Sequence, residues 1–110
     1  MVKNKWGVEI MPERICAIDA STNSLAFATF HGGHLKEVGK IKFEGKDIYE
    51  KVIDAGRKSK GLFDHIVNVD AIVIEHTVFM NSPKTAADLA LVQGALLGAA
   101  GQAGIKTIGK

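Results

Sequence analysis

The sequence predicts one α/β domain built on a mixed sheet, with an antiparallel three-stranded meander joined to parallel strands and flanked by helices. Two apolar runs, residues 15–18 and 71–74, lack polar alternation, which is typical of buried parallel strands. Two adjacent glycines between the strands expected at 25–30 and 35–43 indicate a hairpin loop. A length of 110 residues, 46% of them hydrophobic, fits one domain with a single core.

The composition excludes collagen-like, disordered and disulfide-rich chains. Fourteen Lys and Arg residues against twelve Asp and Glu residues give a formal charge of +2, too small to indicate nucleic-acid binding by itself. The one cysteine, Cys16, lies in an apolar run, so we expect an inert buried thiol and a reducing compartment. The most apolar stretch, residues 86–100, is shorter than the ~20 residues of a membrane span and contains Asp88 and Gln93. We therefore expect a protein without membrane association.

The strands follow from local patterns in the order of the chain. Residues 1–13 show no regular period, so we expect a flexible or edge-packed N-terminal arm ahead of a domain over residues 14–110. We expect the first strand to be covered on both faces, because residues 15–18 are all apolar. The expected strands are residues 14–21, 25–30, 35–43, 69–75 and 105–108, with residues 31–34 as the hairpin loop.

A first helix is expected from Asp47, which is placed to cap it, to about His65. An early end or a kink at Gly61 is the alternative to a helix that continues to His65. Asp54 and Lys58 form an acid-to-base pair at i,i+4, which we expect outside the buried stripe. That stripe consists of Ile48, Val52, Ala55, Ser59, Leu62 and Phe63.

A second helix is expected from Ser82 to about Ala103. A hydroxyl side chain followed by Pro83 is a helix start, and Gly104 is a typical stop. Small residues recur every four positions on this helix, so one of its faces is nearly smooth. Either the sheet or a second subunit is expected to pack closely there, and the residues concerned are Ala86, Ala90, Gly94 and Gly98.

Two carboxylates are the candidate catalytic residues. Asp19 and Glu75 each follow a buried apolar strand, and a right-handed crossover through the first helix allows those two strands to lie side by side. Their side chains would then meet about 4.8 Å apart at the carboxyl edge of the sheet, where active sites of α/β sheets lie. Close carboxylates repel unless a cation joins them, and Mg²⁺ is the cation that prefers such oxygen ligands. The alternative is that Asp19 only forms a turn and Glu75 is a solvated residue at the strand exit.

Cationic side chains are candidate contacts to phosphate groups. Lysines at positions 36, 40 and 42 share one parity of their strand, opposite to Leu35, Ile41 and Phe43, which predicts a cationic solvent face on an edge strand. Lys84 lies in the first turn of the second helix, where free N–H groups also favour a phosphate. Simple solvated surfaces are the alternative for these groups. The candidate cations are Lys36, Lys40, Lys42, Arg57, Lys58, Lys60 and Lys84.

Three stretches together resemble the RuvC-like Holliday junction resolvases, whose fold is that of RNase H and retroviral integrase. They are residues 18–21 (Ile-Asp-Ala-Ser), residues 74–81 (Ile-Glu-His-Thr-Val-Phe-Met-Asn) and the helix that contains Gln93-Gly94-Ala95. The resemblance covers residues 14–110. It implies that Asp19 and Glu75 are metal ligands and that the loop with Phe79 and Asn81 contacts DNA, although Phe79 is shifted by one position from the family's aromatic residue.

This resemblance implies a metal-dependent endonuclease that resolves branched DNA as a homodimer in the cytoplasm of a bacterial or phage-infected cell, with two Mg²⁺ or Mn²⁺ ions. The family completes its site with two further acids on a helix after the fifth strand, and this sequence ends at Lys110 before such a helix. We therefore expect an incomplete domain with weak metal binding and poor cleavage. The alternatives are a non-catalytic DNA-binding or interaction domain and, on a similar first strand and hairpin, an ATPase module of the actin/Hsp70 type.

Overall fold

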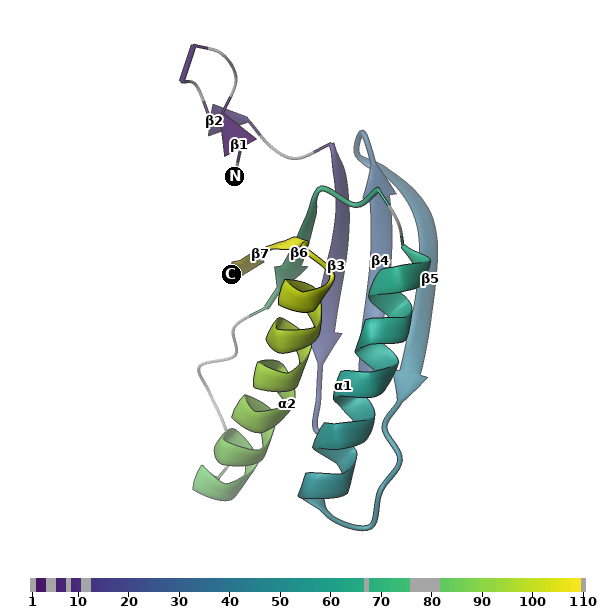
Figure 1. The fold of residues 1–110 in the computed structure, drawn as a ribbon, viewed down its shortest axis with the longest axis vertical. Coiled ribbons are helices and arrows are strands. Elements are labelled where there is room, and N and C mark those ends of the chain that lie inside the picture. The colour runs from purple at the N-terminus through teal and green to yellow at the C-terminus, as the bar shows by residue number, and fades with distance from the viewer. Residues whose placement is uncertain are drawn as a thin grey trace.

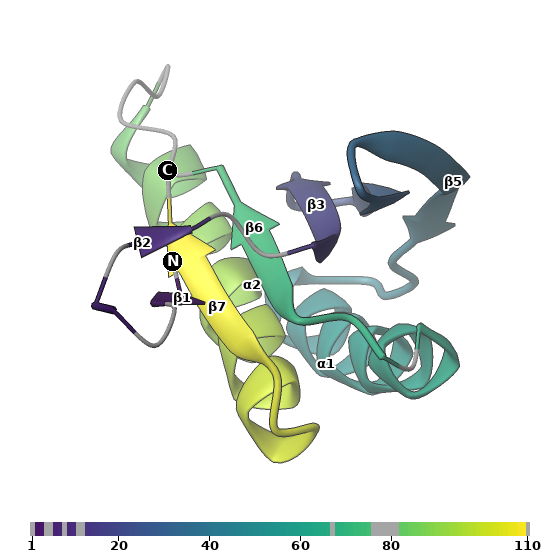
Figure 2. The same ribbon diagram turned by 90° about the horizontal axis from the view of Figure 1, so that it is seen from above.

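A computed structural model describes residues 2–3, 6–7, 9–10, 13–66, 68–75 and 82–109. The domain contains β3 (Arg14–Ala20), β4 (Ser24–His31), β5 (His34–Lys42), α1 (Ile48–His65), β6 (Ala71–Ile74), α2 (Pro83–Gln102) and β7 (Lys106–Gly109). Its five strands form one sheet with the order β5-β4-β3-β6-β7 (Figure 1), and Figure 2 shows that α1 and α2 lie on the same face of this sheet. The predicted α/β class and the predicted order of these seven elements are confirmed.

The N-terminal segment contains two short strands that the sequence analysis did not predict. β1 (Val2–Lys3) and β2 (Glu9–Ile10) pair antiparallel and form a separate two-stranded sheet. In Figure 1 this small sheet lies beyond the N-terminal end of β3. Pairs of only two residues leave no apolar alternation to recognise in the sequence.

The meander of β3, β4 and β5 is antiparallel, as predicted. Gly32 and Gly33 have φ angles of 57° and 81°, the left-handed conformation that a two-residue hairpin turn requires. The β4–β5 register shifts between Thr29 and Phe30, since these pair with Glu37 and Leu35, so Lys36 has no partner in the ladder. The predicted common face of Lys36 with Lys40 and Lys42 is therefore wrong, because the irregularity interrupts the alternation.

The helix caps follow the sequence prediction. The Asp47 carboxylate accepts a hydrogen bond of 2.9 Å from the Glu50 N–H, and the Ser82 hydroxyl accepts one of 3.1 Å from the Thr85 N–H. α1 continues through Gly61 to His65, because its buried face is held by packing. No helix of the described part of the chain is long and apolar enough to cross a membrane.

The core lies between the helices and one face of the sheet. Cys16 and Ile18 of β3 are buried there, and burial together with the nearby Glu37 raises the pKa of the Cys16 thiol to about 12, as suits an inert side chain. The same core contains Leu25, Phe43, Ala55, Leu62, Phe63, Ile72, Val92 and Leu96.

The opposite face of β3 is less covered than the sequence predicts. Ile15 and Ala17 are only partly buried and Asp19 is exposed, so the expectation that this strand is covered on both faces is wrong. The physical reason is that α1 and α2 share one side of the sheet. No helix of the described residues thus covers the sheet face beside the carboxyl ends of β3 and β6.

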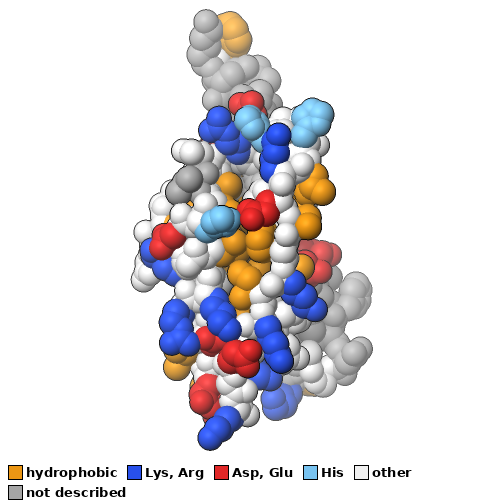
Figure 3. Space-filling view, turned by 90° about the vertical axis from the view of Figure 1, so that its right-hand side faces the viewer, with side chains coloured by type: hydrophobic (Ala, Val, Ile, Leu, Met, Phe, Trp, Pro, Cys, Tyr) orange, Lys and Arg blue, Asp and Glu red, His pale blue; other side chains and the backbone are white. Residues whose placement is uncertain are grey.

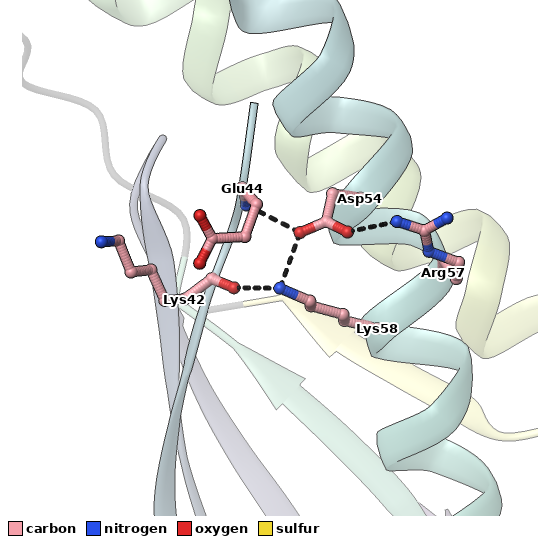
Figure 4. A network of polar contacts seen from close by, with 5 residues as sticks. All are labelled: Lys42, Glu44, Asp54, Arg57 and Lys58. Carbon is pink, nitrogen blue, oxygen red and sulfur yellow. Dashed lines mark hydrogen bonds and ion pairs between the residues drawn. The ribbon is translucent and has the colours of Figure 1, made fainter. Parts of the chain in front are cut away.

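Asp54 is buried, contrary to the predicted place outside the stripe of α1. Its carboxylate accepts hydrogen bonds of 2.7 Å from the Glu44 N–H and from Arg57, and Lys58 contacts it at 2.8 Å (Figure 4). Lys58 also donates to the Lys42 carbonyl oxygen at 2.8 Å. These donors hold the pKa of Asp54 far below its ordinary value of 3.8. The network therefore fastens the end of β5 to the middle of α1.

Replacing Asp54 with Asn should lower the melting temperature by several degrees at pH 7, because the two cations lose their anion. A carboxyl whose pKa is lowered by folding stabilises the protein above its ordinary pKa, and this stabilisation is lost as the pH falls toward the folded-state value. The wild-type free energy of unfolding should therefore fall more steeply below about pH 4 than that of Asp54→Asn. Urea titrations at several pH values measure this.

The control is Asp64→Asn, in an exposed pair with Lys60, which should lower the free energy of unfolding by only about 0 to 1 kcal/mol. Equal slopes of the free energy of unfolding against pH for wild type and Asp54→Asn would contradict the assignment.

Ser59 provides a second stability test. Its hydroxyl oxygen is fully buried on α1 and has no hydrogen-bond partner among the described residues. Ser59→Ala should raise the free energy of unfolding by about 1 kcal/mol, because it removes an unsatisfied polar atom without changing the packing much. A clear loss of stability in chemical denaturation would mean that the hydroxyl is satisfied.

Candidate metal centre

Asp19 and Glu75 are brought together by the pairing of β3 with β6. The two strands are parallel neighbours, and the register pairs Ala17 with Val73 and Ile18 with Ile74. The Glu75 N–H donates to the Ile18 carbonyl oxygen at 3.4 Å, which continues the ladder to the level of the acids. The predicted adjacency of the two strands is thus confirmed, and both acids lie at the carboxyl edge of the sheet.

Both acids line one hollow on the face of the sheet away from the helices. This open-face hollow has a volume of about 510 Å³, and both carboxyl residues are exposed. Its lining comes from three neighbouring strands and contains three alanines, Ala17 of β3 and Ala26 and Ala28 of β4. The lining residues are Ala17, Ile18, Asp19, Ala26, Phe27, Ala28, Val73 and Glu75.

The donor set suits a hard divalent cation. Within the part of the chain that the structure describes, neither the Asp19 nor the Glu75 side chain has a hydrogen bond or an ion pair. Two carboxylates at adjacent strand ends are a common protein contribution to a Mg²⁺ site, with water and phosphate as the remaining ligands. The described residues contain no group of three or more His, Cys, Asp or Glu side chains placed to hold a metal. Asp19 and Glu75 are therefore the two candidate metal ligands at this edge of the sheet.

Gln93 contacts the site, although the sequence analysis named it only in the resemblance and in the apolar stretch and gave it no role there. Its side-chain amide donates to the Glu75 carbonyl oxygen at 3.4 Å, so α2 reaches the residue that ends β6. The signal was present in the sequence, because Gln93 and Asp88 are the two polar side chains, glycines aside, between residues 86 and 100. A polar residue on an otherwise apolar helix often has a specific partner.

The cations predicted to contact DNA differ in their surroundings. Arg57 and Lys58 are held by Asp54, and Lys60 contacts Asp64. Lys84 forms a 2.6 Å ion pair with Asp88, whose side chain is only 18% exposed. Lys40 is exposed and has no hydrogen bond or ion pair among the described residues.

Lys36 belongs to a different part of the surface. It lines a hollow of about 430 Å³ together with Arg14, Glu37 and His65, and His65 lies 3.3 Å from Glu37. Figure 3 shows this side of the molecule, where hydrophobic side chains lie exposed between cationic and acidic groups. Phe79 and Asn81, the predicted loop contacts, lie outside the described residues.

The smooth face of α2 does not contact the sheet. Ala86 is partly buried, Ala90 is exposed, and a Cβ built on Gly94 or Gly98 would meet no described atom within 4 Å. The alternative that this face packs against the sheet is wrong, because larger side chains occupy the buried side of the helix. The larger side chains are Leu89, Val92 and Leu96, and Ala99 and Ala100 are buried beside them.

The sequence matches no protein-family model and no curated protein. Among solved structures, it is similar to Thermus thermophilus RuvC in complex with a Holliday junction substrate, with a TM-score of 0.76 and 18% identity. A second Thermus thermophilus RuvC structure has a TM-score of 0.71 and 19% sequence identity, and both comparisons cover 88% of this chain. YeaZ from Pseudomonas aeruginosa has a TM-score of 0.50 and 16% sequence identity, and the comparison covers 89% of this chain and 43% of the YeaZ chain.

The chain has an RNase H-like fold. The mixed five-stranded sheet and its two helices match the RuvC structures, and this confirms the predicted fold class. This chain spans 63% of the length of each RuvC chain. A sequence identity of 18% to 19% supports the fold alone, so an activity must rest on the residues of the site.

Proposed function

We propose that the chain acts as a metal-dependent endonuclease on branched DNA, with Asp19 and Glu75 as metal ligands. The observation that carries this proposal is the placement of both carboxylates on adjacent parallel strands, at one open-face hollow. The likeness to a RuvC whose structure contains a Holliday junction substrate supports the choice of DNA as substrate.

In the proposed mechanism the two carboxylates bind divalent cations at the edge of the sheet. Mg²⁺ or Mn²⁺, two ions in an intact site, would supply an activated water and stabilise the 3′-oxygen that leaves. Gln93 holds the backbone at Glu75, which limits the movement of that carboxylate relative to Asp19. The small side chains of Ala26 and Ala28 leave room for a DNA backbone beside the acids.

The strength of metal binding follows from the number of ligands. Two carboxylates leave most coordination positions to water and phosphate, so we propose that this chain binds the cation weakly and cleaves DNA slowly. DNA contacts in this proposal include Lys36, Lys40 and Lys84, together with Phe79 and Asn81. Arg57 and Lys58 are better assigned to the Asp54 network, because the carboxylate that they share is buried, whereas the Asp88 partner of Lys84 is partly exposed.

Titration with Mg²⁺ in the presence of a synthetic four-way junction, a linear duplex or ATP tests the activity. Tighter binding of the junction than of the duplex should appear only with metal, followed by slow strand cleavage. Asp19→Asn and Glu75→Gln should each lower the metal-dependent binding about tenfold or more, while Asp64→Asn should leave it unchanged. Junction binding that ignores both the metal and these substitutions would favour a non-catalytic DNA-binding domain, and ATP turnover would favour an ATPase module.

We also propose that two copies pair through the smooth face of α2, formed by Ala86, Ala90, Gly94 and Gly98. Its small residues allow close approach of a second helix, and the neighbouring Leu91 and Leu97 are 45% and 49% exposed. A two-fold dimer would also match the symmetry of a four-way junction.

Gly98→Arg should convert the dimer to a monomer, because a long cation on this face prevents close helix contact. Analytical ultracentrifugation over a range of concentrations measures the change. Tyr49→Arg adds the same charge at an exposed position of α1 and should leave the dimer intact. A wild-type chain that stays monomeric, or a Gly98→Arg dimer, would overturn this pairing.

A further inference from the structure

Lys40 lies in the same row of the sheet as the two acids. The register pairs Lys40 of β5 with Ala26 of β4, and Ala26 with Asp19 of β3. Glu75 continues the row, one residue beyond the Ile18–Ile74 pair. Paired residues of neighbouring strands project from the same face of a sheet. Lys40, Asp19 and Glu75 therefore share the open face at one level.

The distances in this row suit a group held between the lysine and the acids. Two strand spacings of about 4.8 Å separate the Cα atoms of Lys40 and Asp19 by about 10 Å. Ala26 lies between them, and its small methyl group does not block the space above the sheet. An extended lysine side chain spans roughly 6 Å, because each of its five bonds advances it by somewhat more than 1 Å. An extended Lys40 side chain is therefore long enough to cross Ala26 toward Asp19.

The positive charge of Lys40 and the two carboxylates in its row favour a ligand that is an anion and can also bind a metal ion. Lys40 is exposed and has no ion pair among the described residues, whereas Arg57, Lys58, Lys60 and Lys84 each have an acidic partner. A cation bound at Asp19 and Glu75 attracts one oxygen of a phosphodiester. The Lys40 ammonium can then bind another oxygen of the same group.

We propose that Lys40 is the positioning residue that holds the phosphodiester beside the metal ligands. This proposal rests on the proposed function, since it requires a cation at Asp19 and Glu75. It implies that the reacting strand crosses the sheet from β6 toward β5, over the alanines of the open-face hollow. Lys40 orients the phosphate and takes no part in bond making or breaking.

The neighbouring lysines do not share this position. Lys36 is displaced by the irregularity in β5 and lines the hollow with His65. Lys42 pairs with Ser24, two residues along the strands from the row of the carboxylates. Lys46 is an exposed residue of the loop between β5 and α1, with the same charge as Lys40. Lys46 therefore serves as the matched control for loss of one positive charge.

The test measures binding of a fluorescent four-way junction to the 110-residue chain by anisotropy, with Mg²⁺ and again with EDTA. In Mg²⁺, Lys40→Ala should weaken binding about tenfold and Lys46→Ala less than about threefold, while Lys40→Arg should retain most of the affinity. In EDTA the two alanine variants should differ little, because no cation then holds a phosphate beside Lys40. On an Asp19→Asn background the extra loss from Lys40→Ala should also disappear.

The outcomes separate the two proposals. Equal effects of Lys40→Ala and Lys46→Ala in Mg²⁺ would overturn the role of Lys40 while metal-dependent junction binding stands. If Lys40→Ala still weakened junction binding more than Lys46→Ala in EDTA or with Asp19→Asn, the role of Lys40 would also be overturned. The lysine would then act without the metal site. Wild-type binding that does not depend on Mg²⁺ would overturn both proposals. Thermal melting of each variant checks that the fold is intact.

Discussion

The parallel hydrogen-bonded register between β3 and β6 is the constraint on which the site depends. It sets Asp19 and Glu75 at one level although 56 residues separate them in the sequence. A shift of one residue would turn one of the two carboxylates toward the opposite face of the sheet. The buried side chains Ile18 and Ile74 hold the register, because the same shift would expose them to water. The same register is therefore required for the packing of the core and for the geometry of the candidate metal centre.

The one-sided arrangement of the helices gives the sheet two different faces. One face is packed by α1 and α2 and holds the core, while the other presents the acids, the alanines and Lys40 at its surface. The Asp54 network supports this division, because it ties the end of β5 to α1 and occupies two cations in doing so (Figure 4). Lys40, which lies in line with the carboxylates, is exposed and has no ion pair among the described residues.

Local signals in the sequence predict the elements well, because caps, glycine turns and apolar runs act over a few residues. Asp47, Ser82 and the Gly32–Gly33 turn are examples. The burial of Asp54 was not predictable, since it depends on a backbone N–H ten residues away. The displacement of Lys36 likewise depends on pairing with β4. The row that joins Lys40 to the acids required the register of four strands, which the sequence pattern alone does not contain.

Paramagnetic line broadening by Mn²⁺ in NMR spectra of the ¹⁵N-labelled chain tests the shared cation site most directly. A single ion between the two strand ends should broaden the amide signals of Asp19 and Glu75 at the same low Mn²⁺ concentration. Either Asp19→Asn or Glu75→Gln should then remove the broadening at both strands, because each carboxylate supplies half of the protein ligands. Broadening at one strand alone, or its survival in both variants, would contradict the account.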